Sequence, residues 1–245
     1  MDIKTYRGSY NPDEERYYKI SRSKIESYMN CKRCFYLDRR LKVQQPPGFP
    51  FNLNSAVDQL LKNEFDEHRE KQTTHPYIKK LGLNAVPFKH ELIDPWRENF
   101  KGVEYVIEDL RLLIHGAVDD VWFNLDTNEL IVVDYKSTSK GSDIDLNSEW
   151  QIGYKRQMEI YQFLVRKNGF KVSNTGYFVY ANGSREGNFN EELKFKMYLL
   201  DYTGDDSWVE ETIKDIHVLL NQDNIPDHNH DCDYCKYVLA NKSIE

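Results

Sequence analysis

Apolar residues recur three or four positions apart in several stretches of the chain, which is the spacing of amphipathic helices. The clearest stretch is residues 54–68, whose apolar stripe consists of Val57, Leu60, Leu61 and Phe65. The same spacing predicts helices over residues 148–167 and 208–220, and a shorter helix that begins near Ser23 and leads to Cys31. Each of these helices is expected to bury one face.

Short apolar runs rich in β-branched and aromatic residues lie between these helices and predict strands. Two of them, residues 112–123 and 130–133, flank residues 124–128, whose side chains favour a tight turn, so a β-hairpin is expected there. Residues 175–181 and 193–200 predict two more strands. The order of helices and strands predicts an α/β fold with a central mixed β-sheet flanked by helices.

The length of the chain favours one sizeable core. At 245 residues we expect a single domain over residues 1–245. Residues 70–100 contain scattered prolines and no clear period, which predicts an irregular helical insertion. No apolar run approaches the ~20 residues that a bilayer span needs, and the polar N-terminus lacks the apolar core of a secretory signal. We therefore expect a cytoplasmic protein with no membrane partner.

The predicted hairpin places two aspartates opposite each other. If its turn is centred between Asp126 and Thr127, then Asp119 and Asp134 are equally far from the centre, with Cβ atoms about 5 Å apart. Lys136 follows two residues after Asp134, so its side chain emerges on the same strand face. A slip of one residue would move Asp119 to the other face.

Two carboxylates this close repel each other unless a positive group lies between them, and a bound divalent cation supplies that charge. Two acidic ligands and a lysine on one face suit the hydrolysis of a phosphodiester. The metal would hold a phosphate oxygen and lower the pKa of bound water. Lys136 would neutralise developing charge or help to place the nucleophile.

Residues on two predicted helices could complete such a site. Asp58 and Glu64, on the helix over residues 54–68, are candidate metal ligands. Gln157 and Tyr161 are four residues apart, so they share a helix face and could hold phosphate, water or a base. The simpler alternative is that all these residues are solvated charges and ordinary surface pairs.

All four cysteines of the chain lie in two C-x-x-C pairs. They are Cys31 and Cys34 in C-K-R-C, and Cys232 and Cys235 in C-D-Y-C. In a cytoplasmic chain such pairs indicate a metal or cluster site more than disulfides. The site would join residues 21–43 to residues 221–240, with His228 and His230 as bystanders. Zinc with four thiolates and a 4Fe-4S cluster both fit this ligand set.

The formal net charge of −7 does not suggest a general nucleic-acid coat protein, which would be basic. It does not exclude a nuclease, because metal ions neutralise the acids of such a site and basic contacts can be local. The densest basic cluster has aromatic residues between its members, which suits a DNA backbone and stacked bases. Its members are Lys32, Arg33, Arg39, Arg40 and Lys42. The alternative is a solvated helix face.

These motifs, in this order, resemble the PD-(D/E)XK nuclease superfamily, in particular its RecB-like branch and the related CRISPR-associated exonucleases. The resemblance rests on G-A-V-D at residues 116–119, D-Y-K at residues 134–136 and Q-x-x-x-Y at residues 157–161. It implies a restriction-endonuclease-like core in which Asp119 and Asp134 bind magnesium or manganese. It also implies that Lys136 is the catalytic lysine and that Gln157 and Tyr161 contact DNA or position the site.

The chain departs from that family pattern in two places. RecB-like members usually carry a metal-binding histidine on the first core helix, where this chain aligns Asp58, and aspartate is a competent oxygen ligand for magnesium. Iron–sulfur members typically use one cysteine near the N-terminal helix and three near the C-terminus, whereas here the split is two and two. We expect a structural 4Fe-4S cluster, with zinc as the alternative.

The sequence thus predicts a metal-dependent DNA nuclease that hydrolyses phosphodiester bonds. By resemblance we expect an exonuclease acting on single strands or duplex ends, in DNA repair or recombination or in CRISPR-type DNA processing. Its partner would be a helicase or a CRISPR integration protein. The alternative is a non-catalytic DNA-binding module that keeps the nuclease fold and the cysteine site, and a third possibility is an RNA-directed nuclease on the same fold.

Overall fold

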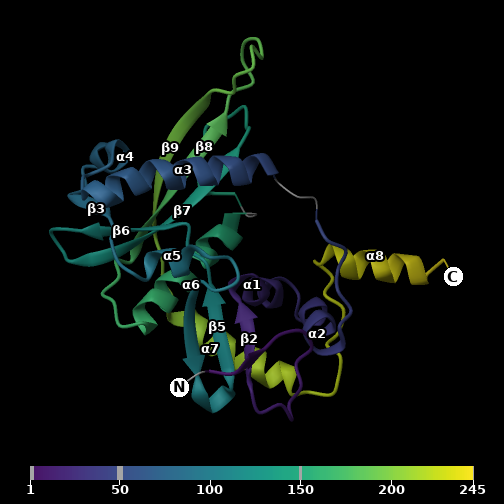
Figure 1. Ribbon diagram of the computed structural model, residues 1–245. Helices are drawn as coiled ribbons and strands as arrows, with labels where there is room; N and C mark the ends of the chain where they lie inside the picture. The colour runs from purple at the N-terminus through teal and green to yellow at the C-terminus, as the bar shows by residue number, and fades with distance from the viewer. Residues whose placement is uncertain (1–2, 49–51, 149–150, 245) are drawn as a thin grey trace. The chain divides into compact units, whose positions relative to one another are not determined.

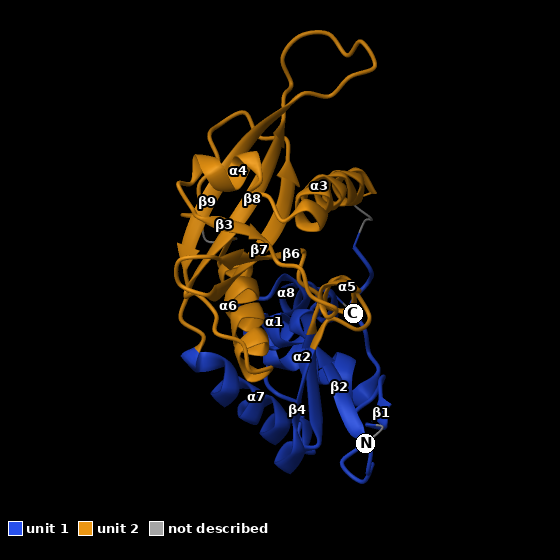
Figure 2. Cartoon of the chain, turned by 60° about the vertical axis from the view of Figure 1, so that its left-hand side comes forward, with its two compact units in different colours: residues 1–49, 104–115, 207–245 blue, residues 50–103, 116–206 orange. Residues whose placement is uncertain are grey.

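The computed structural model describes residues 3–48, 52–148 and 151–244. The chain forms two compact units, each built from segments that lie far apart in the sequence (Figure 2). Unit 1 comprises residues 1–49, 104–115 and 207–245, and unit 2 comprises residues 50–103 and 116–206. The expectation of one domain over residues 1–245 stays a prediction.

Unit 1 contains a four-stranded sheet in the order β1-β2-β5-β4, of which Figure 1 labels β2 and β5. Its strands are β1 (Thr5–Tyr6), β2 (Tyr17–Ser21), β5 (Leu112–Gly116) and β4 (Val103–Ile107). Strand β2 runs parallel to both β1 and β5. Its helical elements are α1 (Arg22–Asn30), α2 (Lys32–Leu41), η1 (Glu108–Leu110), α7 (Ser207–Leu220) and α8 (Asp233–Lys242).

The core of unit 1 forms where helices α1, α2 and α7 contact one another. Ile25 of α1, Phe35 of α2 and Ile213 of α7 are completely buried. Removing such side chains from water contributes roughly 1.5–3 kcal/mol each. Helix α8 is different, because Cys235 is its only buried residue among those described.

Unit 2 contains a five-stranded sheet in the order β3-β6-β7-β8-β9. Its strands are β3 (Ala85–Pro87), β6 (Asp120–Asn124), β7 (Glu129–Thr138), β8 (Thr175–Gly183) and β9 (Phe195–Thr203). Strands β7 and β8 are parallel and the other neighbours are antiparallel. Its helices are α3 (Asn52–Lys71), α4 (Pro76–Lys80), α5 (Ile93–Arg97) and α6 (Ile152–Lys167).

Helices α3 and α6 cover opposite faces of this sheet. Phe65 of α3 packs against Val133 and Tyr135 of β7. Side chains alternate along a strand, and the intervening Asp134 contacts α6 through Gln157. Helix α6 also approaches β8 closely, since a Cβ atom at Gly176 would overlap the side chain of Met158. The sheet thus packs a hydrophobic core rich in aromatic residues against α3, and Asp134 faces α6.

The predicted α/β class, with mixed sheets flanked by helices, is confirmed. The expectation of one central sheet is not, because the run over residues 112–123 divides into β5 and β6, which belong to different sheets. The break lies at residues 117–119, between two strands of similar apolar character, so hydrophobicity alone does not reveal it. Residues 70–100 also differ from a purely helical insertion: besides α4 and α5 they contain β3, which pairs with β6.

Among the described residues, no helix combines the length and the apolar character needed to cross a membrane.

Candidate active site

The β6–β7 hairpin has the register that the sequence predicts. Asp120 pairs with Val133 and Asn124 pairs with Glu129, so one further step places Asp119 opposite Asp134. The backbone N–H of Tyr135 donates a hydrogen bond of 2.9 Å to Oδ2 of Asp119, which holds this carboxylate beside β7.

The turn of this hairpin fixes that register through its own polar side chains. Oδ1 of Asn124 accepts hydrogen bonds from the backbone N–H groups of Asp126, at 2.9 Å, and Thr127, at 3.2 Å. Asn128 adopts the left-handed conformation, with φ of 55°, which asparagine tolerates better than most residues. The local sequence therefore determines where Asp119 and Asp134 meet.

Asp134 is fully buried and its two oxygens have different surroundings. Oδ1 accepts a hydrogen bond of 2.6 Å from Nε2 of Gln157, and the same amide donates to the hydroxyl of Tyr161 at 3.2 Å. Oδ2 accepts no hydrogen bond from the described residues and forms an ion pair with the ammonium of Lys136. The predicted shared face of Gln157 and Tyr161 is confirmed, and it is directed at Asp134.

Helix α3 brings a third carboxylate and a second lysine to this place. Nζ of Lys62 lies 2.9 Å from Oδ2 of Asp58 and 3.9 Å from Oδ1 of Asp119. Burial, and then the negative charge of Asp119, raises the pKa of Asp58. Asp58 therefore lies beside the hairpin carboxylates, as its alignment predicts. Glu64 is turned to another partner, Nε2 of His75, at 3.0 Å.

Two further residues contact this site and were not predicted from the sequence, Lys62 and Tyr154. Lys62 follows Asp58 by four residues, a spacing that places two side chains on one helix face and could have identified it. Nζ of Lys136 lies 4.8 Å from the ring centre of Tyr154, a cation–π contact. Tyr154 precedes Gln157 by three residues, so it also lies on the site-facing side of α6.

The carboxylates of this site outnumber its cations. Three aspartates, at positions 58, 119 and 134, face two lysines, at positions 62 and 136, which leaves a formal excess of one negative charge. Burial, and then the charge of Asp134, raises the pKa of Asp119 to about 6. Burial lowers the pKa of Lys136, but Asp134 and Asp119 more than offset this, so the pKa lies above that of a free lysine.

These residues suit a hard divalent cation. They provide carboxylate oxygens, the ligands that magnesium and manganese prefer, and one of these, Oδ2 of Asp134, is buried with the ammonium of Lys136 as its charged partner. The three aspartates form a looser group than the cysteines do, because only the four cysteines of the described chain have ligand atoms all within 4.8 Å of one another.

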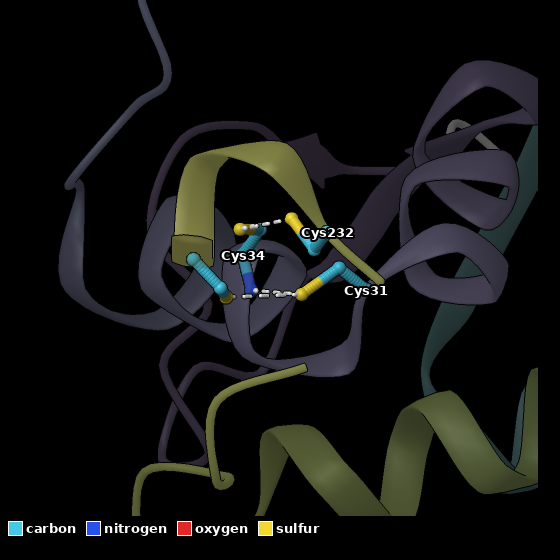
Figure 3. A group of neighbouring side chains, drawn as sticks. Cys31, Cys34 and Cys232 are labelled. Atoms are coloured by element: carbon cyan, nitrogen blue, oxygen red, sulfur yellow. Dashed lines mark hydrogen bonds between the residues drawn. The ribbon is translucent and has the colours of Figure 1, made fainter. Parts of the chain in front are cut away.

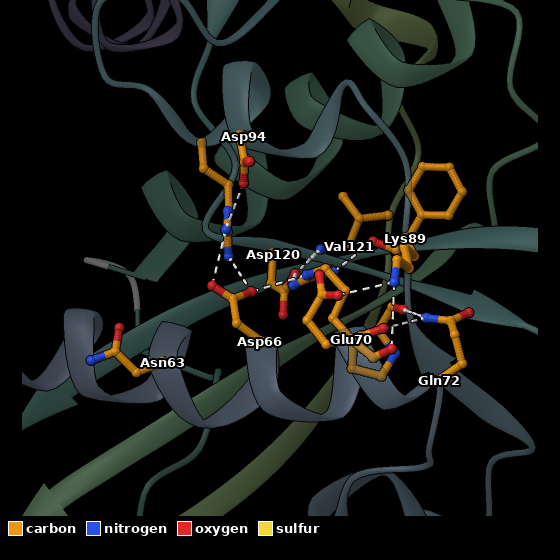
Figure 4. Close-up of polar contacts among 12 residues, drawn as sticks. Asn63, Asp66, Glu70, Gln72, Lys89, Asp94, Asp120 and Val121 are labelled. Atoms are coloured by element: carbon orange, nitrogen blue, oxygen red, sulfur yellow. Dashed lines mark hydrogen bonds and ion pairs between the residues drawn. The ribbon is translucent and has the colours of Figure 1, made fainter.

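Asp120 neighbours Asp119 in sequence but takes no part in this group. It is fully buried and accepts hydrogen bonds from Nη2 of Arg69, at 2.5 Å, and from the hydroxyl of Tyr135, at 2.7 Å. Arg69 also binds Asp66, which is shared with Arg97. Figure 4 labels the two carboxylates, Asp66 and Asp120. Asp120 therefore belongs to an ion-pair network that joins α3 to the sheet.

The predicted DNA-binding residues lie on α2 in unit 1, where the side chains of all four make contacts within the unit. The contacts are Arg33 to the carbonyl of Pro226 at 2.7 Å, Arg39 to Asp38 at 2.9 Å, Arg40 to the carbonyl of Tyr10 at 3.3 Å, and Lys32 over the ring of Tyr28 at 5.3 Å. Contact of these four residues with DNA stays a prediction.

The four cysteines meet in unit 1, as the sequence predicts (Figure 3). None forms a disulfide. Sγ of Cys31 lies 3.7 Å from that of Cys235, and Sγ of Cys34 lies 3.6 Å from that of Cys232. The group contains neither His228 nor His230. These contacts join residues 21–43 to residues 221–240.

Replacing Asp119 with asparagine is expected to stabilise the metal-free protein at pH 7.5 by roughly 1–3 kcal/mol, because each unit of pKa shift corresponds to about 1.4 kcal/mol. A folded-state pKa above that of an unfolded aspartate means that wild type loses stability as the pH rises from about 4 to about 6. The variant should not lose stability over this pH range, because asparagine does not titrate. Magnesium should no longer raise the melting temperature of the variant. Thermal unfolding with EDTA and with magnesium measures both effects. A metal-free variant less stable than wild type at pH 7.5 would contradict this account of the charges.

Comparison with known proteins identifies the family of this chain. No curated protein matches the chain. One similar solved structure, SSO0001, has 16% identity and a TM-score of 0.33, with 94% of this chain and 87% of that one covered. Another, a "putative exonuclease" from Eubacterium rectale, has 15% identity and a TM-score of 0.39, with 89% and 87% covered. The model of the PD-(D/E)XK nuclease superfamily matches residues 19–238, most of the sequence. The chain belongs to the PD-(D/E)XK nuclease superfamily.

Proposed function

We propose that this nuclease-family chain is a magnesium- or manganese-dependent deoxyribonuclease whose catalytic residues are Asp119, Asp134 and Lys136. The observation that carries the proposal is the register of the hairpin, which sets Asp119 opposite Asp134 while Lys136 pairs with the buried Asp134. Membership of a nuclease superfamily supports phosphodiester hydrolysis as the reaction.

Asp58, Asp119 and Asp134 are the residues that would hold the cation. A magnesium or manganese ion bound there would polarise a phosphate oxygen and provide water of lowered pKa. Gln157 holds one oxygen of Asp134 through its amide, so it would fix the direction of that carboxylate. Tyr161 contacts the same amide and would act as a positioning residue or contact the substrate.

Lys136 would act as a cation rather than as a base. Its pKa lies above that of free lysine because Asp134 and Asp119 outweigh the effect of burial. Asp134 and the ring of Tyr154 hold its ammonium in place, where it would stabilise negative charge that develops on a phosphate. A fixed cation of this kind costs no reorganisation when the reaction occurs.

Replacing Lys136 with glutamine tests this role. We expect cleavage to fall by about 10²–10³-fold, the usual effect of losing one group that stabilises developing charge. The magnesium-dependent rise in melting temperature should remain, because the carboxylates remain. Single-turnover cleavage and thermal unfolding give the two results. Unchanged cleavage would remove Lys136 from the catalytic residues.

Within this proposal we favour the RecB-like branch and an exonuclease that acts on single strands or duplex ends. Cleavage assays with four substrates of one sequence test these choices. The substrates are linear single-stranded DNA, linear duplex DNA, covalently closed circular DNA and RNA. An exonuclease degrades the linear DNAs and leaves the circle intact. Cleaved circles would indicate an endonuclease, and preferred cleavage of RNA would overturn the choice of DNA.

One observation favours the alternative of a non-catalytic DNA-binding module. The ammonium of Lys62 lies between Asp58 and Asp119 and already neutralises part of the charge that would attract a cation. Such a module would bind DNA with a steep dependence on salt and would cleave it with neither metal. If the protein is a nuclease, replacing Lys62 with methionine should strengthen its binding of magnesium. If it is a binding module, the same variant should still fail to cleave DNA.

A further inference from the structure

The four cysteine sulfurs are gathered more tightly than an unligated set of thiols requires. All four Sγ atoms lie within 4.8 Å of one another, and two pairs lie at 3.7 and 3.6 Å. A disulfide would bring two sulfurs to about 2.05 Å, so these are not bonded pairs. Three of the four cysteines are buried, and Cys232 is partly buried.

The separations match a single tetrahedral ion. Four sulfurs at about 2.3 Å from one zinc ion lie about 3.8 Å from each other. In a 4Fe-4S cluster each cysteine binds a different iron, so the four sulfurs surround the whole cluster and stand much further apart than sulfurs that share one ion. The observed spacing leaves no room for four irons and four sulfides.

The two C-x-x-C pairs have the same local construction. Cys31 is the N-cap of α2 and Cys232 is the N-cap of α8. The carbonyl of Cys31 accepts from the N–H of Phe35 at 3.0 Å, and the carbonyl of Cys232 accepts from the N–H of Lys236 at 2.9 Å. Both pairs thus present two sulfurs at a helix N-terminus, where the helix dipole favours negative thiolates.

Helix α8 has little else to hold it in place. Cys235 is its only buried residue among those described, and apolar neighbours such as Tyr237, at 73% exposure, and Val238, at 42%, remain in solvent. Burial of apolar surface therefore contributes little to the docking of α8. The contacts of Cys235 and Cys232 with Cys31 and Cys34 are therefore the main connection between α8 and α2.

We propose that Cys31, Cys34, Cys232 and Cys235 bind one structural zinc ion, and not the 4Fe-4S cluster that resemblance to iron–sulfur nucleases implies, and that this ion attaches α8 to α2. Structural zinc sites with four thiolates are closed and contribute folding energy directly. The proposal is independent of the nuclease site, which lies in unit 2.

Metal analysis of the full chain, purified both in air and under anaerobic conditions with iron and sulfide supplied, tests the identity of the ion. We expect one zinc per chain in both preparations, no acid-labile sulfide, and the intense visible bands of tetrahedral thiolate cobalt after exchange with Co²⁺. About four irons with sulfide per chain would overturn the proposal, and so would one iron without sulfide.

Hydrogen exchange tests the attachment of α8. Removal of zinc from wild type by a strong chelator should abolish the protection of amides in α8 while those in α7 stay protected, and added zinc should restore it. Cys235→Ser should lose zinc and the same protection, whereas the matched control His230→Gln should keep both. Unchanged protection of α8 after complete zinc removal would overturn the structural role, and this readout does not require the variant to be active.

Discussion

Replacing Asp134 with asparagine is expected to lower metal-dependent cleavage of DNA by about 10³-fold or more, the equivalent of several kcal/mol of transition-state stabilisation. Asparagine keeps the shape of the side chain and can still accept a hydrogen bond from Gln157. It removes the negative charge that would hold the cation and that fixes the ammonium of Lys136. The loss should therefore appear in the rate of the chemical step.

The matched control is Asp126→Asn in the turn of the same hairpin. Asp126 is exposed and accepts a hydrogen bond of 2.7 Å from Asn84, at the end of the hairpin away from Asp134. This variant should cleave DNA as wild type does, and both variants should keep the wild-type circular dichroism spectrum. Equal cleavage by Asp134→Asn and wild type would remove the hairpin from the proposed site.

The second large effect concerns stability and not catalysis. Replacing Arg69 with methionine should lower the free energy of unfolding by about 3–5 kcal/mol, because it leaves the buried charge of Asp120 without its partner. Arg69 also donates to the carbonyl of Phe88 and, within α3, to Asp66, so two contacts between α3 and its surroundings disappear. Urea denaturation measures the change through the shift of the midpoint.

Two further variants distinguish the effect of the buried Arg69–Asp120 ion pair from that of an exposed ion pair. Lys71→Met removes an exposed ion pair with Glu67 on the same helix and should cost less than about 0.5 kcal/mol. The double variant Arg69→Met, Asp120→Leu should lose less than the two single variants together, because no unpaired charge remains. Additive losses, or an Arg69→Met variant as stable as Lys71→Met, would contradict the role given to this network.

The hairpin and the cysteine site were predictable from the sequence because their determinants are local. Asn124 and Asn128 specify the turn, and the alternation of side chains then places Asp119 against Asp134. Two C-x-x-C pairs that contain every cysteine of the chain indicate a shared metal site more than any other function. In both cases short-range chemistry determines which side chains meet.

The remaining features depend on contacts between distant segments, which local spacing, such as that of Asp58 and Lys62, indicates only in part. Residues 112–123 are mostly apolar and β-prone, and the apolar pattern alone does not show that β5 and β6 join different sheets. Lys62 and Tyr154 approach the site only because α3 and α6 pack on the sheet beside it. The separation of the cysteine sulfurs, which distinguishes one ion from a cluster, is likewise a property of the folded chain.

The central claim is tested most directly by incubating purified wild-type protein with end-labelled linear DNA in magnesium or manganese, and with EDTA in a parallel reaction. The account predicts cleavage with metal, none with EDTA, and a product ladder that reveals the direction of digestion. Intact DNA under every metal condition, with binding still detected, would contradict the nuclease proposal and support a binding module that retains the nuclease fold.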